Sequence, residues 1–181
     1  MKNSIYICML ASLYIASCKT PEPRRPKKHS VNNFYKEVIA ENKKLNALEK
    51  NAIEARLKKD TLHRYESSAR GFWYTYVNKD TVATQLPVKG DQVTIDYVIT
   101  DIDGNTIYER QTRDYVVDKE DFVPGLQEGI KLMKKGETVT FVIPSYRAYG
   151  VTGDGNRIGI NQTIKSTLTL IEIKKLNNEV K

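Results

Sequence analysis

A helical pattern of apolar residues begins after residue 30. Between residues 31 and 61 apolar side chains recur three and four positions apart, which places them on one face of a helix, and no glycine or proline interrupts the run. Ser30 is a suitable N-cap residue, and Glu54 and Lys58 have the spacing of an i,i+4 ion pair. The apolar positions are Val31, Phe34, Tyr35, Val38, Ile39, Leu45, Leu48, Ile53 and Leu57. The sequence therefore predicts an N-terminal helical segment within residues 30–66, with its helix over residues 31–61.

This apolar stripe has three interpretations. It packs against a following domain, it forms the seam of a homodimer or of another complex, or it belongs to a lone charged spacer. We favour packing or dimerisation, because an uncovered apolar face promotes nonspecific association.

After Gly71 the hydrophobic pattern changes to the two-residue period of β-strands. Asp103-Gly104 is a hairpin turn signal, and Pro124 and Gly136 bracket one short helical pattern. The expected strands are residues 72–77, 91–100, 115–117, 137–143 and 163–173, together with a return strand that begins at residues 107–109. A helix is expected over residues 124–133 and a glycine-rich loop over residues 149–160. Antiparallel strands around one short helix predict an α+β fold.

The first residues have the pattern of an export signal. Lys2 precedes an apolar run over residues 5–16, which is shorter than the roughly 20 residues that a membrane-spanning helix needs. Ile15-Ala16-Ser17-Cys18 resembles the lipobox of bacterial lipoproteins, in which the cysteine is acylated after cleavage. The sequence thus predicts a signal peptide over residues 1–17 and a membrane anchor at Cys18. The alternative is an ordinary signal peptide with a chance cysteine.

Charge and composition exclude several functions. The net charge of +7 is concentrated in residues 19–28, which carry five basic residues, one acidic residue and three prolines, so residues 18–29 are expected to form an acylated, extended tether beside the membrane. The remaining chain has no basic stripe interleaved with aromatic residues, and no nucleic-acid partner is expected. With two cysteines and two histidines, neither a structural zinc site nor a Ser-His-Asp hydrolase is expected, and we predict no metal and no cofactor.

Three stretches carry a resemblance to a known family. They read VTIDYVITDIDGNTIYER, FVPGLQEGIKLMKKGE and FVIPSYRAYGVTG, and the last contains Ala148-Tyr149-Gly150. Their order resembles that of FKBP-type peptidyl-prolyl isomerases. This implies an FKBP-like antiparallel sheet wrapped around one short helix, over residues 70–176, with the long helix before it. The lipobox, tether and helix further resemble the FKBP-like lipoproteins associated with gliding motility in Bacteroidetes.

The chemistry of this family suits the residues present. Rotating an X–Pro peptide bond breaks no covalent bond but crosses a barrier of about 18–20 kcal/mol. An apolar pocket favours the twisted, less polar amide, and a fixed donor stabilises its shifted charge. The resemblance implies that Tyr149 donates its hydroxyl to the substrate carbonyl, that the backbone N–H of Val123 binds a carbonyl, and that Tyr97 forms a wall. It implies further substrate-binding positions at Ile107, Tyr108, Phe122, Leu126, Ile158 and Ser166. Tyr97, Val123 and Ile158 have an alternative interpretation as plain core residues.

Four of these positions depart from the family pattern. Ile107 and Ser166 replace phenylalanines, Tyr108 replaces an aspartate that polarises the site, and Leu126 replaces a tryptophan at the pocket floor. These departures predict a shallower pocket and weaker turnover.

Three functions follow as hypotheses. The first is a membrane-anchored prolyl isomerase of the bacterial envelope, on the periplasmic side or the cell surface. It would act on X–Pro segments of exported proteins, including those of a gliding-motility apparatus. The second is an FKBP-like module that binds proline segments or a partner without catalysis. The third is a structural spacer of an envelope machine.

Overall fold

The computed structural model describes residues 31–82 and 85–175. The predicted signal peptide, Cys18 and the tether lie outside these residues. The chain divides into two units, residues 1–40 and residues 41–181, which we describe separately. None of the helices in the described ranges is long and apolar enough to span a bilayer.

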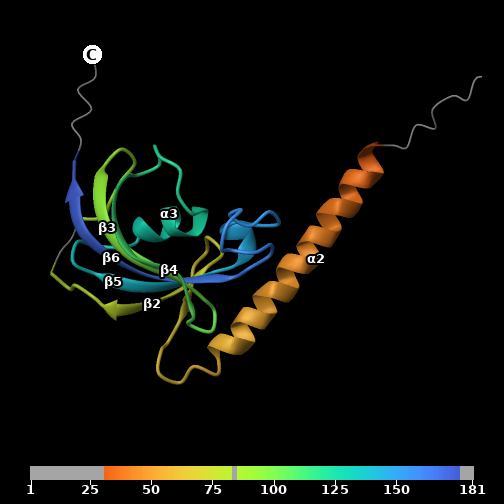
Figure 1. The fold of residues 1–181 in the computed structure, drawn as a ribbon, viewed down its shortest axis with the longest axis horizontal. Helices are drawn as coiled ribbons and strands as arrows, with labels where there is room; N and C mark the ends of the chain where they lie inside the picture. Colours follow the sequence, from red (N-terminus) through yellow and green to blue (C-terminus); the bar gives the residue numbers. More distant parts are fainter. Residues whose placement is uncertain (1–30, 83–84, 176–181) are drawn as a thin grey trace, which may run out of the picture. The chain divides into compact units, whose positions relative to one another are not determined.

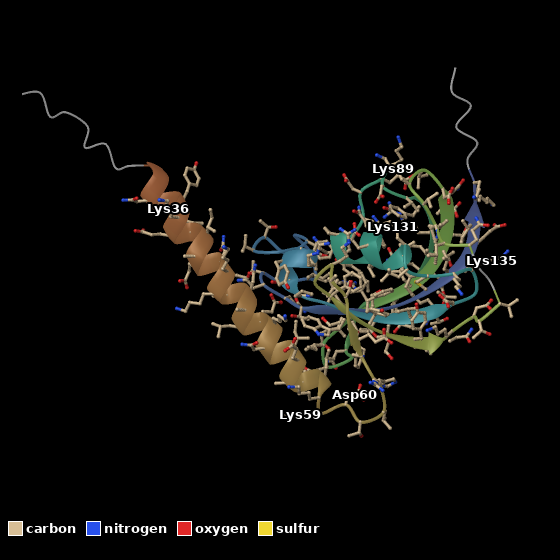
Figure 2. The ribbon with its side chains drawn as sticks, turned by 180° about the vertical axis from the view of Figure 1, so that it is seen from behind. Lys36, Lys59, Asp60, Lys89, Lys131 and Lys135 are labelled. Atoms are coloured by element: carbon tan, nitrogen blue, oxygen red, sulfur yellow. The ribbon has the colours of Figure 1, made fainter. Side chains whose placement is uncertain are left out.

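Helix α2, Val31–Leu57, confirms the predicted long N-terminal helix but ends before residue 61. Beyond Leu57, the carboxylate of Asp60 accepts hydrogen bonds from the backbone N–H groups of Leu62 (3.0 Å) and His63 (3.2 Å), and this turn competes with further helix. Figure 2 shows Lys59 and Asp60 directly after the last turn of α2.

The apolar stripe of α2 divides along the helix. In the unit that ends at Ala40, Phe34 and Tyr35 are 65% and 59% exposed. In the second unit Leu45 and Leu48 are also exposed, whereas Ile53 is only 2% exposed and packs with Trp73 and Val142. The C-terminal half of α2 therefore packs on the sheet through Ile53, and the predicted packing face is limited to this end of residues 41–57.

Six strands form one antiparallel sheet with the order β1-β2-β5-β6-β3-β4. The strands are β1 Glu66–Ser67, β2 Trp73–Asn78, β3 Gln92–Asp101, β4 Thr106–Val116, β5 Thr138–Ile143 and β6 Ile164–Lys174. Helix α3, Pro124–Ile130, lies on the inner side of the curved sheet, and the 3-10 helix η2, Ser145–Arg147, follows β5 (Figure 1). This architecture confirms the predicted α+β class and the short helix inside an antiparallel sheet.

Strand β4 corrects one sequence prediction. Residues 107–109 were expected to begin the return strand and residues 115–117 to form another short strand, but one strand runs from Thr106 to Val116. It pairs with β3 at the edge of the sheet, and its charged residues Glu109, Arg110 and Asp114 stay exposed. An edge strand needs no continuous apolar alternation, and for this reason the hydrophobic pattern missed its centre.

Two glycines bring α3 close to the sheet. A Cβ atom at Gly125 would lie 2.5 Å from Cγ2 of Ile143, and one at Gly129 would lie 2.6 Å from Cε1 of Phe141. Because these two glycines carry no Cβ atom, α3 approaches the sheet closely and Leu126 and Ile130 are completely buried in the core. This packing fixes the N-terminal end of α3, where the candidate site begins.

Candidate functional site

A pocket of about 530 Å³ opens between the N-terminal end of α3, strand β4 and the loop after η2. Its apolar walls come from Tyr97, Ile99, Phe122, Val123 and Ala148, and its polar groups include Tyr108, Arg113, Tyr149 and Asp154. The volume is that of a site for a small ligand or for a few side chains of a peptide.

The aromatic wall of the pocket is tightly packed. Tyr97 on β3 is only 5% exposed, and its ring meets that of Phe122 edge-on at 5.3 Å with an interplanar angle of 80°. The guanidinium of Arg113 lies over the ring of Phe122 at 5.1 Å from its centroid, and the ring of Tyr115 lies 5.5 Å from the same ring at a tilt of 38°. Phe122 is therefore held between strands β3 and β4 and keeps the pocket edge in place.

Tyr149 brings a hydroxyl donor to the pocket. The backbone N–H groups of its neighbours Ala148 and Gly150 both donate to the carbonyl of Ser145, at 2.9 and 2.8 Å, and Gly150 has a φ of 62° that suits glycine. Burial and the nearby negative charge of Asp154 raise the pKa of the Tyr149 hydroxyl, so it stays protonated at neutral pH. None of the hydrogen bonds among residues 31–82 and 85–175 uses this hydroxyl. It is thus available to a ligand.

Tyr108 and Asp154 form a second polar pair at the pocket. The hydroxyl of Tyr108 donates to Oδ2 of Asp154, while Oδ1 accepts from the backbone N–H groups of Asn156 (2.9 Å) and Ile158 (2.8 Å). Although burial opposes it, these hydrogen bonds hold the pKa of Asp154 below its ordinary value. Although Tyr108 stands where the family pattern has an aspartate, the pocket still contains a carboxylate, because the glycine-rich loop supplies Asp154.

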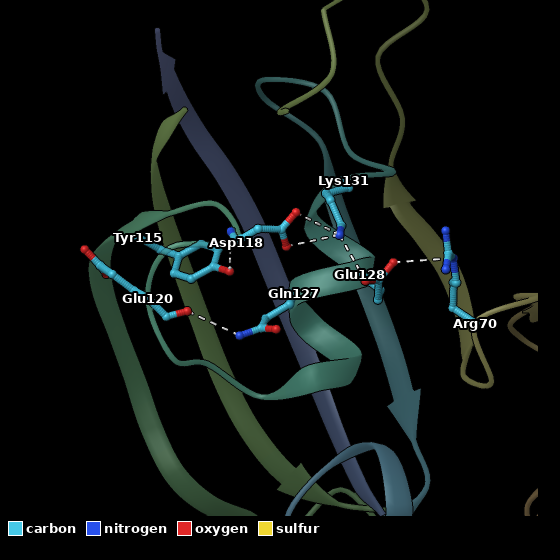
Figure 3. A network of polar contacts seen from close by, with 7 residues as sticks. All are labelled: Arg70, Tyr115, Asp118, Glu120, Gln127, Glu128 and Lys131. Atoms are coloured by element: carbon cyan, nitrogen blue, oxygen red, sulfur yellow. Dashed lines mark hydrogen bonds and ion pairs between the residues drawn. The ribbon is translucent and has the colours of Figure 1, made fainter. Parts of the chain in front are cut away.

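Helix α3 is held in place by a polar network on both sides (Figure 3). Nζ of Lys131 lies 3.1 Å from Oδ1 of Asp118 and 2.9 Å from Oε1 of Glu128, and Glu128 also pairs with Arg70 at 3.4 Å. The complete network contains Arg70, Tyr115, Asp118, Glu120, Gln127, Glu128 and Lys131. It ties α3 to the segments before β2 and after β4. Val123, the N-cap residue of α3, is thereby fixed at the pocket edge.

The structure brings five of the nine sequence-predicted site residues to the pocket and places four elsewhere. Tyr97, Tyr108, Phe122, Val123 and Tyr149 line it. Leu126 and Ser166 are fully buried in the fold, and Ser166 Oγ donates to the carbonyl of Val98 at 2.9 Å. Ile158 is 3% exposed and belongs to the core, and half-buried Ile107 packs against it.

Two charged lining residues of particular interest, Asp154 and Arg113, were not predicted from the sequence. Asp154 lies between Gly153 and Gly155 in a loop whose sequence indicates only a turn. Arg113 has the pattern of an ordinary charged surface residue of a strand. No local signal links Asp154 to Tyr108, because the two are 46 residues apart. Arg113 could have been suspected from its place on the return strand, nine residues before Phe122.

A larger hollow of about 690 Å³ lies elsewhere, along the C-terminal half of α2 and the outer face of the sheet. Charged residues of α2 and of the turn after it, such as Arg56, Lys59 and Asp60, make up much of its lining. It does not include Tyr97 or Tyr149. We take the smaller pocket as the candidate site, because it combines an apolar aromatic wall with an unused donor. No group of three metal-ligating side chains occurs within the described ranges.

Comparison with known proteins finds a family that part of this chain resembles. Residues 83–171 match the family model described as FKBP-type peptidyl-prolyl cis-trans isomerase. The chain is 36% identical over 90 residues to "Probable FKBP-type peptidyl-prolyl cis-trans isomerase FkpA" of Neisseria meningitidis, which covers 48% of this chain and 33% of that protein. It is 33% identical over 108 residues to "Outer membrane protein MIP" of Legionella longbeachae, which covers 58% of this chain and 45% of the relative.

These similarities cover part of each relative. FkpA of Escherichia coli K12 is 31% identical over 111 residues, which are 60% of this chain and 40% of that protein. The chain thus spans between 33% and 45% of the length of these three relatives. A crystal structure of a peptidyl-prolyl cis-trans isomerase from Pseudomonas syringae superposes with a TM-score of 0.59 at 23% identity and covers 70% of this chain and 91% of that one. This superposition supports the fold.

Proposed function

Because the chain carries an FKBP-type peptidyl-prolyl cis-trans isomerase domain over residues 83–171, we propose that it catalyses the cis-trans rotation of X–Pro peptide bonds. The observation that carries the proposal is the half-buried, protonated hydroxyl of Tyr149 beside an aromatic pocket, with no hydrogen-bond partner among the described residues. The proline ring would enter the pocket against Tyr97 and Phe122. Its amide would leave water and twist, since the planar, more polar form loses its hydration there.

Two donors support the twisted amide. The Tyr149 hydroxyl would donate to the substrate carbonyl, and the backbone N–H of Val123, used by no hydrogen bond among the described residues, would bind a second carbonyl of the peptide. The carboxylate of Asp154 and the guanidinium of Arg113 line the pocket and would determine the electrostatic field at the bound amide. Ile107, Leu126, Ile158 and Ser166 would then act from behind the lining by fixing the shape of the walls. No proton transfer or nucleophile is needed.

An exchange experiment tests the proposal. Two-dimensional NMR exchange on an X–Pro peptide with the purified protein should give a cis-trans rate well above the uncatalysed one. Replacing Tyr149→Phe should lower kcat/KM about tenfold, or about 1.4 kcal/mol, because the donor is lost while the pocket is kept. Tyr146→Phe is the matched control, since that tyrosine is exposed and lies outside the pocket. An uncatalysed rate with the unmodified protein would refute the enzymatic proposal.

A binding module without appreciable turnover is the second candidate. Leu126 is fully buried and does not reach the pocket, which favours a shallow floor and weak enclosure of proline. This function predicts that an X–Pro peptide shifts the NMR signals of Tyr97 and Val123 without accelerated exchange. The same samples therefore distinguish the two functions.

We further propose an envelope location. A relative named outer membrane protein MIP and the lipobox at Cys18 support a lipoprotein anchored through acylated Cys18 after removal of residues 1–17, with clients among exported proteins, including those of a gliding-motility apparatus. Replacing Cys18→Ala should move the protein from the membrane fraction to the soluble fraction. An unchanged distribution would contradict the anchor.

The helix supports a further proposal about assembly. Phe34, Tyr35 and Ile39 are exposed apolar residues of α2 that a second copy or another envelope protein would cover. Sedimentation equilibrium of the purified protein should report a dimer, and Phe34→Glu should yield a monomer. If the protein is a monomer at every concentration and captures no envelope partner, the assembly proposal is contradicted. This segment would then be interpreted as a spacer.

A further inference from the structure

One carboxylate of α2 contacts the loop that carries Tyr149. Oε1 of Glu49 accepts hydrogen bonds from the backbone N–H of Ser145 (2.7 Å) and from Oγ1 of Thr163 (2.6 Å). Oε2 accepts from Oγ of Ser145 at 2.8 Å. The two partners are 96 and 114 residues further along the chain, and Glu49 itself lies outside the family-matched residues 83–171.

These contacts join both ends of one loop. Ser145 begins η2 just before Tyr149, and Thr163 directly precedes β6. Within the loop, the N–H of Asn161 donates to the carbonyl of Gly150 at 2.8 Å, so the two sides of the loop already meet next to Tyr149. The Glu49 carboxylate closes the same loop at its base.

The path from Glu49 to Tyr149 is short. Ser145 receives the carboxylate through its N–H and its hydroxyl, and its own carbonyl accepts the N–H groups of Ala148 and Gly150, the two neighbours of Tyr149. Ser145 is only 5% exposed, so water does not readily replace these contacts. A shift at Ser145 would therefore move the backbone on both sides of the phenol.

Glu49 is held in position by the packing of its own helix. Ile53 lies four residues later, on the same face of α2, and is buried against Trp73 and Val142. The charged group is thus supported by an apolar anchor one turn away. By contrast, Glu41 on the same helix is 61% exposed, and among the described residues its one ion pair is with Lys44, at 4.0 Å.

We propose that Glu49 is a positioning residue for Tyr149, so that α2 completes the prolyl isomerase site although it precedes the family-matched domain. This inference rests on the proposed function. Substrate does not touch Glu49. It acts through Ser145 by fixing the place of the phenol that donates to the substrate carbonyl.

The test compares three variants of α2 in the purified protein. Glu49→Ala should lower kcat/KM between about fivefold and tenfold, because a misplaced catalytic group loses its alignment. Glu49→Gln should retain most of the activity, since its amide oxygen can accept from Ser145 N–H and Thr163 Oγ1 while its NH₂ donates to Ser145 Oγ. Glu41→Ala is the matched control and should leave the rate unchanged.

A double-mutant cycle separates positioning from general stability. If Glu49 acts through the Tyr149 hydroxyl, Glu49→Ala should reduce the residual rate of Tyr149→Phe less than about twofold, because the group that it positions is already absent. Fully multiplicative losses, or a Glu49→Ala rate equal to that of the unmodified protein, would overturn the inference.

Hydrogen exchange gives a readout that does not depend on activity. The Gly150 N–H should exchange faster in Glu49→Ala than in Glu49→Gln, whereas the N–H of Phe141 in β5 should not change. Should Glu49→Ala fail to fold, Thr163→Val removes one of the three hydrogen bonds with little change in volume and should give a smaller effect of the same kind. Absence of catalysis in the unmodified protein would refute the proposed function. Unchanged exchange of the Gly150 N–H in the variants would refute the positioning role of Glu49.

Discussion

The hydroxyl of Tyr108 donates a hydrogen bond to the carboxylate of Asp154 across the mouth of the pocket. The phenol comes from edge strand β4 and the carboxylate from the glycine-rich loop, so the pair ties this strand to the loop. Arg157 adds to this connection, since its guanidinium donates to the carbonyl of Ile107 at 3.0 Å and lies over the Tyr108 ring. The polar side of the site therefore depends on two distant segments.

Restoring the family pattern at position 108 should be harmful. Tyr108→Asp would place a second carboxylate near Asp154 and remove the donor that Asp154 uses, so we expect lower thermal stability and lower kcat/KM. Adding Asp154→Asn should relieve the repulsion and recover part of both. Thermal melts and exchange rates of the single and double variants check this. A gain of activity in Tyr108→Asp alone would show that the pair is not a functional unit.

The stabilising effect of Asp154 should depend on pH. Although burial opposes it, the hydrogen bonds to Asp154 lower its pKa in the folded protein below the ordinary value of 3.8, so the carboxylate stabilises the fold above that pH. The contribution is lost as the pH falls through the lower, folded-state pKa. The difference in Tm between the unmodified protein and Asp154→Asn should be constant from about pH 7 to about pH 5 and shrink below pH 3.8. A difference that grows on acidification would contradict this sign.

The catalytic pH profile should be flat at neutral pH. Burial raises the pKa of the Tyr149 hydroxyl above its ordinary value of 10.0, and only the protonated phenol can donate to a substrate carbonyl. We expect kcat/KM to remain constant up to about pH 9 and to fall only as the phenol ionises. In Tyr149→Phe this alkaline decrease should disappear. A decrease of kcat/KM near neutral pH would show that a group other than the Tyr149 hydroxyl controls the rate.

Close packing of α3 makes Gly129 sensitive to substitution. Gly129→Ala would place a Cβ atom 2.6 Å from Cε1 of Phe141, and we expect the free energy of unfolding to fall by about 1–3 kcal/mol. Because Leu lacks the ring that clashes, Phe141→Leu should destabilise less in the Gly129→Ala background than by itself. Urea unfolding of the four proteins of this cycle measures the coupling. Additive losses would indicate that α3 shifts away from β5.

Local sequence signals predicted the fold well where burial follows a regular period. The alternating residues of β3, β5 and β6 fill the core, and these strands begin and end within one or two residues of the predicted ranges. The edge strand β4 and the end of α2 were placed less well, because a solvated edge and the Asp60 turn carry no hydrophobic period. Both errors have the same origin.

The site was predictable only in part. The family resemblance led to Tyr97, Phe122, Val123 and Tyr149, which do meet at one pocket. It could not indicate that Asp154 would approach Tyr108, or that Glu49 would reach Ser145, because both contacts depend on how the finished fold brings distant segments together. Likewise, the positions of Leu126 and Ser166 behind the lining follow from packing rather than from their neighbours in sequence.

The edge position of β4 has a consequence for a protein that would handle unfolded chains. Among the described strands β4 pairs only with β3, so one side of an 11-residue backbone lacks a neighbouring strand. Such a rim could recruit an extended client by strand addition and trap it in an aggregate. Exposed Glu109, Arg110 and Asp114 discourage this capture, because a docking strand would have to desolvate their charges. The polar centre that obscured β4 in the sequence thus protects this edge of the sheet against strand addition.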